Sequence, residues 1–154
     1  MPKTLFLLSL LFYVNLAIAS WQEVAKEGTQ AHLNGDYDQV KLIEQRLLDN
    51  ADFPIGHIFA LNTIITHLTW DDTDTQYDDA ILSHTSEVLN WCEPRLNSED
   101  LVAIANHYCG QASFTLSFYH GLKGNYIRAG QYGDQAIKRL EAALVADPKL
   151  TDAK

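Results

Sequence analysis

The chain has 154 residues, of which 11 are basic and 20 are acidic, so its formal net charge at pH 7 is −9. An acidic surface repels nucleic-acid phosphates and anionic lipid headgroups, which argues against nucleic-acid binding and against adsorption to an anionic membrane. A chain of this length supports one domain with a substantial hydrophobic core, but not two.

The N-terminal segment has the composition of a secretory signal peptide. Lys3 supplies a positive start, residues 5–19 are almost wholly apolar, and Ala17 and Ala19 are the small residues that a signal peptidase reads. The alternative is a transmembrane anchor, but the apolar run is shorter than the roughly 20 residues that a bilayer crossing needs. We therefore expect residues 1–19 to be a cleaved signal peptide, leaving an exported protein without a stable membrane anchor.

After this segment the apolar residues recur at helical spacing, and no alternating strand pattern of useful length is present. A first helix is predicted at 21–33, and the pair Asn34-Gly35 suits a left-handed helix stop. A second helix is predicted at 36–49. A third is opened by Pro54, and its apolar residues lie nearly all round the helix, so we expect it to be central in the fold.

The second half of the chain continues this pattern. A fourth helix is predicted after the acidic stretch 71–74, and a fifth begins at 97–100 and extends to Ala129. The last helix spans Tyr132 to Ala146 and stops before a proline. The sequence therefore predicts an all-α fold of about six helices after the signal peptide, joined by short polar turns into antiparallel hairpins.

The chain contains two cysteines, Cys92 and Cys109. Export into an oxidising compartment permits a disulfide between them. With a hairpin turn at 94–97, however, Cys109 would lie about ten residues up the second helix, ~15 Å from the level of Cys92. Because a disulfide joins Cα atoms no more than ~7 Å apart, this geometry favours two buried, unpaired thiols.

The C-terminal part of the sequence carries a repeat pattern. Most of its members recur at three- and four-residue steps, and Tyr132 follows Gly130 at two. They are Tyr119, Leu122, Tyr126, Gly130, Tyr132, Ala136, Leu140, Ala143, Leu144 and Pro148. The pattern resembles the tetratricopeptide repeat (TPR), in which small residues let two helices approach closely, glycine permits the turn and proline ends the second helix. The step from Tyr132 to Ala136 is one residue longer than in that family, so Gly133 looks like an insertion.

The resemblance is best at 116–149, weaker at 21–54 and degenerate at 55–97. It implies that residues 20–154 form a short TPR-like α-solenoid of stacked hairpins, as in exported bacterial proteins of this repeat type. The ending at 146–154 resembles a junction before a further repeat. We therefore expect a fragment of a longer repeat protein, whose last helix lacks a cap and can self-associate.

Residues for catalysis, cofactors or metals are not found in a recognisable arrangement. The acidic run 71–79 lacks the glycine and the distal glutamate of a calcium loop. The six histidines include no pair at the four-residue spacing that places two imidazoles on one helix face. Nucleophile and phosphate-loop motifs are also missing. We therefore predict no enzyme activity, no cofactor and no metal site.

The TPR resemblance implies a binding role, because the first helix of each repeat lines a concave groove that takes an extended peptide or a partner helix. A terminal-carboxylate clamp, used by one TPR subgroup, is not expected, because Ala25, Thr29, His120 and Gly124 occupy its positions. The predicted groove residues are Gln22, Thr29, His32, Ser117, His120, Ile127 and Arg128.

Two functions follow from these observations. The first is a non-catalytic protein–protein interaction scaffold of the bacterial periplasm or cell exterior, with a protein or peptide partner that the sequence does not identify. The alternative is a small-molecule or lipid carrier with an aromatic pocket between its helices. The aromatic residues that suggest this pocket are Tyr108, Phe114, Phe118, Tyr119 and Tyr126.

Overall fold

The computed structural model describes residues 21–49 and 53–150, so the predicted signal peptide lies outside the described residues. Within these ranges the chain forms α-helices and one 3₁₀ helix, without a strand, and none of these helices is long and apolar enough to cross a membrane. The predicted all-α fold is therefore confirmed. The elements are α2 (Trp21–Leu33), α3 (Tyr37–Leu48), α4 (Ile55–Trp70), α5 (Asp78–Cys92), the 3₁₀ helix η1 (Glu93–Arg95), α6 (Val102–Leu122) and α7 (Tyr126–Ala146).

The described residues divide into two compact units, 21–43 in the first and 44–49 with 53–150 in the second, with the boundary inside α3. In the first unit α2 ends at the predicted Asn34-Gly35 pair. Gly35 adopts a left-handed φ of 75°, and the Asp36 backbone N–H donates to the Ala31 carbonyl at 3.0 Å. The Asp36 carboxylate then accepts a 3.2 Å hydrogen bond from the Gln39 backbone N–H, which caps the start of α3.

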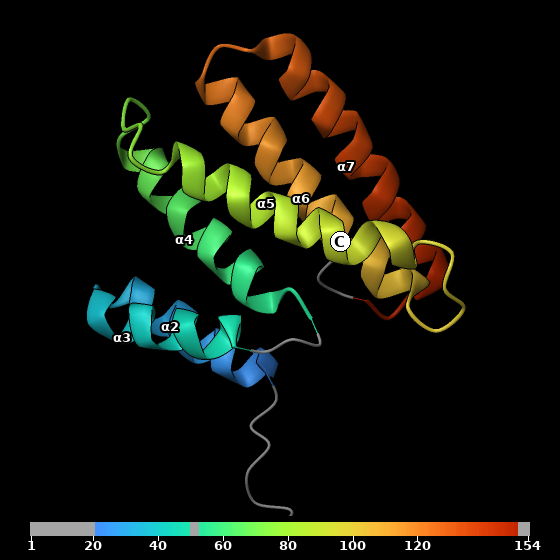
Figure 1. The fold of residues 1–154 in the computed structure, drawn as a ribbon, viewed down its shortest axis with the longest axis horizontal. Helices are drawn as coiled ribbons and strands as arrows, with labels where there is room; N and C mark the ends of the chain where they lie inside the picture. Colours follow the sequence, from blue (N-terminus) through green and yellow to red (C-terminus); the bar gives the residue numbers. More distant parts are fainter. Residues whose placement is uncertain (1–20, 50–52, 151–154) are drawn as a thin grey trace, which may run out of the picture. The chain divides into compact units, whose positions relative to one another are not determined.

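The second unit contains α4, α5, α6 and α7, which lie beside one another as antiparallel helices (Figure 1). As predicted from its apolar residues, α4 is buried around most of its circumference. The core of this unit combines residues of α4, α5 and α6: Ile58, Leu61, Ile64, Leu68, Ile81, Val88, Cys92, Ala105, Tyr108, Cys109, Ala112 and Tyr119. These three helices are therefore held together by burial of apolar surface.

The most extensive helix–helix interface is that of α6 with α7. A Cβ atom on Gly110 would come within 2.8 Å of the Leu140 side chain, so the two helices meet where α6 has no side chain. Ala136 and Ala143 of α7 are buried, in agreement with their predicted role as small contact residues. The Ser117 hydroxyl adds a 2.8 Å hydrogen bond across the interface to the Ala129 carbonyl.

The predicted position of the turn between the last two helices is wrong. The structure places this turn at 123–125, where Gly124 has a φ of 73°, and Gly130 and Tyr132 lie inside α7. The predicted insertion at Gly133 is also a helical position. A Cβ atom on Gly133 would come 3.2 Å from the Ser117 hydroxyl, so this glycine allows close packing of α6 and α7.

The prediction of two unpaired thiols is wrong as well. Cys92 and Cys109 form a disulfide, with their Cα atoms 5.7 Å apart. The connection is longer and lies later in the chain than the predicted turn at 94–97, because η1 continues beyond α5 to Arg95 and α6 begins only at Val102. Cys92 is therefore separated from the turn by η1, and Cys109 lies fewer residues along α6 than expected, which brings the two cysteines to a similar level of the antiparallel hairpin.

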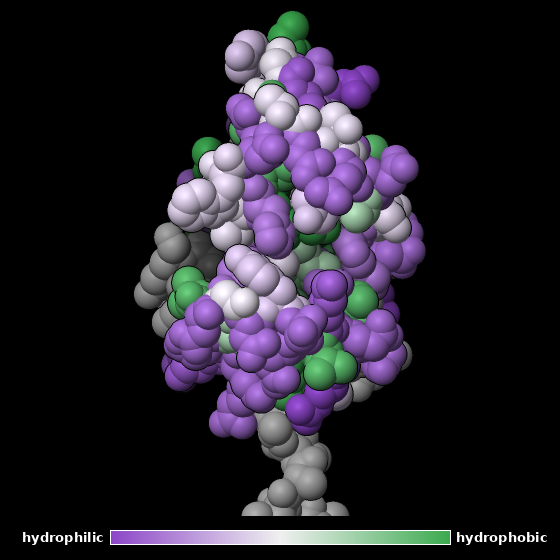
Figure 2. Space-filling view, turned by 90° about the vertical axis from the view of Figure 1, so that its left-hand side faces the viewer, coloured by the Kyte–Doolittle hydropathy of each residue, from purple (hydrophilic) through white to green (hydrophobic). Residues whose placement is uncertain are grey.

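The face shown in Figure 2 is mostly hydrophilic, with hydrophobic residues in small separate patches. Several large apolar side chains are nevertheless exposed, among them Trp70 on α4 and Ile137 and Val145 on α7. Single apolar residues on a surface are ordinary, whereas large contiguous patches usually mark contact sites.

Candidate functional site

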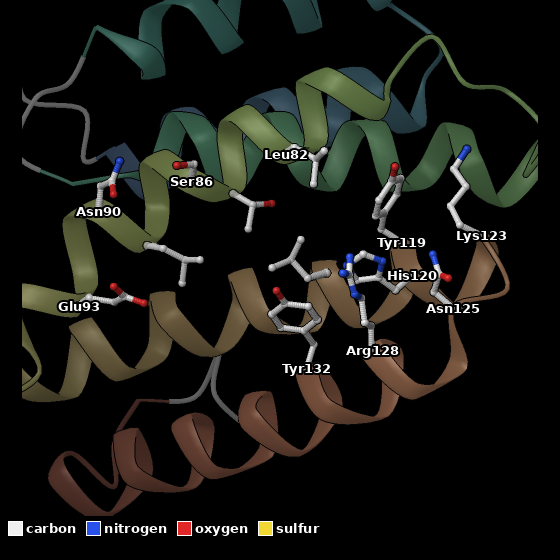
Figure 3. A pocket seen from close by; sticks show the side chains of 13 residues that line it. Leu82, Ser86, Asn90, Glu93, Tyr119, His120, Lys123, Asn125, Arg128 and Tyr132 are labelled. Carbon is white, nitrogen blue, oxygen red and sulfur yellow. The ribbon is translucent and has the colours of Figure 1, made fainter.

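An open groove with a volume of about 570 Å³ lies between α5, α6 and α7 (Figure 3). Its residues recur at three- and four-residue steps, which places them on one face of each helix. Along α5 and η1, the groove extends from Leu82 to Glu93, or about 17 Å at 1.5 Å per residue. The lining residues are Leu82, Thr85, Ser86, Leu89, Asn90, Glu93, Leu116, Tyr119, His120, Lys123, Asn125, Arg128 and Tyr132.

The two ends of the groove differ in charge. Figure 3 shows His120, Lys123, Asn125 and Arg128 gathered at one end, whereas Glu93 lies at the other. The Lys123 ammonium is 2.9 Å from the Asp78 carboxylate and is therefore partly neutralised. Arg128 is exposed and makes no ion pair with any residue that the structure describes. Its guanidinium is therefore the cation available to an anionic ligand at this end.

Two buried polar side chains of the groove each have a hydrogen-bonding atom without a partner among the described residues. His120 is 8% exposed and stacks on the Tyr132 ring, with ring centroids 5.4 Å apart. Within the described part of the chain, neither His120 Nδ1 nor the Thr85 hydroxyl has a hydrogen-bond partner. A buried polar atom without a partner costs about 1–3 kcal/mol, so a ligand that draws these side chains into hydrogen bonds recovers free energy.

The protonation of His120 follows from its surroundings. Burial lowers the pKa of this imidazole below its ordinary value, and the positive charge of Arg128 lowers it further. His120 is therefore neutral at pH 7, with one ring nitrogen able to donate a hydrogen bond and the other able to accept one.

The four predicted groove residues of the C-terminal repeat do not all reach this groove. His120 and Arg128 line it. Ser117 instead faces α7, where its hydroxyl donates to the Ala129 carbonyl. Ile127 is 82% exposed and borders a separate shallow hollow of about 330 Å³ at the start of α7.

The three predicted groove residues near the N-terminus lie on α2, in the first unit. Gln22 and Thr29 are exposed, and the Thr29 hydroxyl donates to the Ala25 carbonyl of its own helix. His32 is partly buried, and its ring meets the Tyr37 ring edge-on at 5.7 Å. Their predicted role in partner binding stays a prediction.

The five aromatic residues that suggested a carrier pocket differ widely in burial. Tyr108 and Tyr119 are buried, whereas Phe114 and Tyr126 are 60% and 77% exposed. Tyr119 is the member of this set that lines the groove. The expected aromatic stripe is thus split between the core and the surface.

The α5 side of the groove was not predicted from the sequence. The groove residues of α5 lie next to the buried face of this helix, which consists of Ile81, Thr85, Val88 and Cys92. The spacing of Leu82, Ser86 and Asn90, which recur every four residues, indicates that they share one face of the helix. Mixed apolar and polar character made this stripe indistinguishable from an ordinary helix border.

Comparisons of this chain with protein-family models, with curated proteins and with solved structures found no match. The functional argument therefore depends on the groove and its residues.

Proposed function

We propose that this protein is a non-catalytic binding module of the bacterial periplasm or cell exterior, and that its groove between α5, α6 and α7 takes a peptide segment of a partner protein. The observation that carries this proposal is a helix-lined groove about 17 Å long, at one end of which Arg128 makes no ion pair with any described residue. That length fits about five extended residues or three turns of a helix.

The lining indicates the chemistry of the segment. The Arg128 guanidinium favours a carboxylate, which it can bind through two parallel hydrogen bonds. Leu82, Leu89 and Leu116 supply apolar surface, and Glu93 at the opposite end repels a second carboxylate. We therefore propose an apolar segment with an acidic group at the end that meets Arg128.

Three further features support the proposed setting, architecture and self-association. The Cys92–Cys109 disulfide is typical of proteins in oxidising compartments, which supports export. Close packing of α6 and α7 at small residues supports a TPR-like solenoid. The exposed Ile137 and Val145 on α7 support the proposed self-association through the last helix.

The proposal is tested by selecting peptides from a random library displayed on phage against the purified chain. Fluorescence anisotropy then compares a selected peptide with wild-type protein and with Arg128→Gln. We expect Arg128→Gln to weaken binding about tenfold or more, because a charge-assisted hydrogen bond contributes roughly 1.5–3 kcal/mol.

Lys138→Gln is the matched control, because Lys138 lies on the same helix but pairs locally with Asp134 outside the groove. It should leave the affinity unchanged. Equal weakening by both variants would indicate unspecific attraction to positive charge, and failure to select any peptide would overturn the proposal.

The second candidate is a small-molecule carrier, because the groove volume falls within the ~300–1,000 Å³ of small-molecule sites. Native mass spectrometry of the purified chain distinguishes the two functions. A bound molecule that is lost in a groove variant such as Leu116→Ala favours the carrier, whereas a ligand-free chain that binds selected peptides favours the binding module.

A further inference from the structure

Two histidines from different helices meet on the side of α5 that faces α4. His57 lies near the start of α4, and His84 lies on α5, which runs beside α4 (Figure 1). Their Nδ1 atoms are 2.9 Å apart, and their ring centroids are 5.2 Å apart with a 54° angle between the rings. Both rings are partly buried, so the neighbouring helices restrict their positions.

The two Nδ1 atoms are at hydrogen-bond distance, and two nitrogens that bind one metal ion side by side have a similar separation. Imidazole nitrogens bind transition metals at about 2.0–2.1 Å, so two such ligands at a right angle are about 2.9 Å apart. Right angles occur in the square-planar and tetragonal sites of Cu²⁺ and Ni²⁺.

Two carboxylates lie near enough for their charges to act on this pair. Glu87 lies one helical turn after His84, and its negative charge acts on both imidazoles. The negative charge of Glu44 acts on His84. Glu87 and His57 also line an open cavity of about 350 Å³, which gives an ion a path from solvent. In the hydrogen bond between the two rings, one Nδ1 carries the proton and the other accepts it through its lone pair.

We propose that His57 and His84 bind one divalent copper or nickel ion through their Nδ1 atoms, with the Glu87 carboxylate and water as the remaining ligands. Within the described residues, no three His, Cys, Asp or Glu side chains already form a metal-binding group. Glu87 is exposed and reaches the ion by rotating its side chain. The proton shared by the two Nδ1 atoms moves to Nε2 of the same ring when the ion binds, so both imidazoles remain neutral ligands.

The proposal does not depend on the groove, and it is tested with the untagged full chain and Cu²⁺ alone. Isothermal titration calorimetry should show one ion per chain, with a Kd of roughly 10 µM or lower. Electron paramagnetic resonance of the Cu²⁺-loaded chain should show splitting from two nitrogen ligands. Binding weaker than this, or a spectrum without two nitrogens, overturns the proposal even without variants.

Variants then assign the ligands. His57→Ala and His84→Ala should each weaken Cu²⁺ binding at least about tenfold, since even partners of metal ligands contribute 10- to 100-fold to affinity. Glu87→Gln should weaken it while leaving the two-nitrogen splitting in place. His67→Ala, on the same helix as His57 but outside the pair, is the control and should bind as wild type does. Equal affinity in His84→Ala and His67→Ala, with both folded by circular dichroism, contradicts the assignment.

Discussion

Gly110 of α6 lies directly against Leu140 of α7: a Cβ atom on this glycine would come 2.8 Å from two side-chain carbons of Leu140 and 3.3 Å from its backbone nitrogen. The contact lies in the most extensive interface of the second unit. Gly130, also inside a helix, has no atom within 4 Å of an added Cβ. The two glycines therefore form a matched pair.

Alanine at these two positions should have opposite effects on the free energy of unfolding. Gly130→Ala should stabilise the protein by about 0.5–1 kcal/mol, because alanine loses less backbone entropy in a helix. Gly110→Ala gains the same helix preference but must displace Leu140, so it should be less stable than Gly130→Ala by about 1–3 kcal/mol. Urea denaturation followed by circular dichroism measures both values, and equal stability of the two variants would show that α6 and α7 are not in close contact at Gly110.

Loss of the disulfide should lower stability without abolishing the helical fold. The bond closes a loop over a sequence separation of 17, for which the chain-entropy relation gives about 3 kcal/mol. The double variant Cys92→Ser/Cys109→Ser should unfold at correspondingly lower urea. Wild type in reductant should behave like the variant, and wild-type unfolding that is insensitive to reductant would contradict the disulfide.

Removal of the Arg128 charge should raise the pKa of His120. Burial is the larger cause of the low pKa of this imidazole, and repulsion from Arg128 is the second, so Arg128→Gln removes only part of the shift. A histidine NMR titration of both proteins, with the His120 signals assigned through a His120→Gln spectrum, measures the change. An unchanged or lower pKa would place the guanidinium away from His120 in solution.

Acidification should destabilise the protein in the range where histidines titrate. The pKa of His120 is lowered in the folded protein, so below the ordinary value of about 6.5 the unfolded chain binds the proton more readily. The contribution of this neutral histidine to stability is therefore complete above pH 6.5 and is lost as the pH falls towards the folded-state pKa. The loss cannot exceed about 1.4 kcal/mol per pH unit for one histidine.

Urea denaturation at pH 7.5 and pH 5.5 measures this effect. His120→Gln should show a smaller difference in unfolding free energy between the two pH values than wild type does. Part of the difference should remain in the variant, because the pKa values of His57 and His84 are lowered too. An identical pH dependence in wild type and His120→Gln would contradict the prediction.

Local features were predicted well from the sequence because they depend on neighbouring residues. The limits of α2 and the stop at Gly35 follow from apolar spacing and from the ability of glycine to adopt a positive φ. The turn before α7 was harder to predict because the pattern Gly-x-Tyr occurs twice, at 124–126 and at 130–132. Asn125 after Gly124 marked the correct position, since asparagine also disfavours a helix interior.

Contacts that depend on how far one helix is shifted along its neighbour could not be predicted from the sequence in the same way. The distance between Cys92 and Cys109 depends on where the hairpin turns, and a shift of a few residues changes an impossible bond into a formed one. His57 and His84 are 27 positions apart, so no spacing rule brings them together. The groove could not be predicted for the same reason, because its three walls come from separate helices.

The two ends of the groove are cross-linked by different chemistry. The disulfide joins α5 to α6 beside Glu93, at one end of the groove, and the Lys123–Asp78 ion pair joins the start of α5 to the residue after α6 at the other end. A reductant breaks the first cross-link, whereas salt screens the second. The two ends of the groove therefore respond to different solution conditions, and salt acts at the end where Arg128 lies.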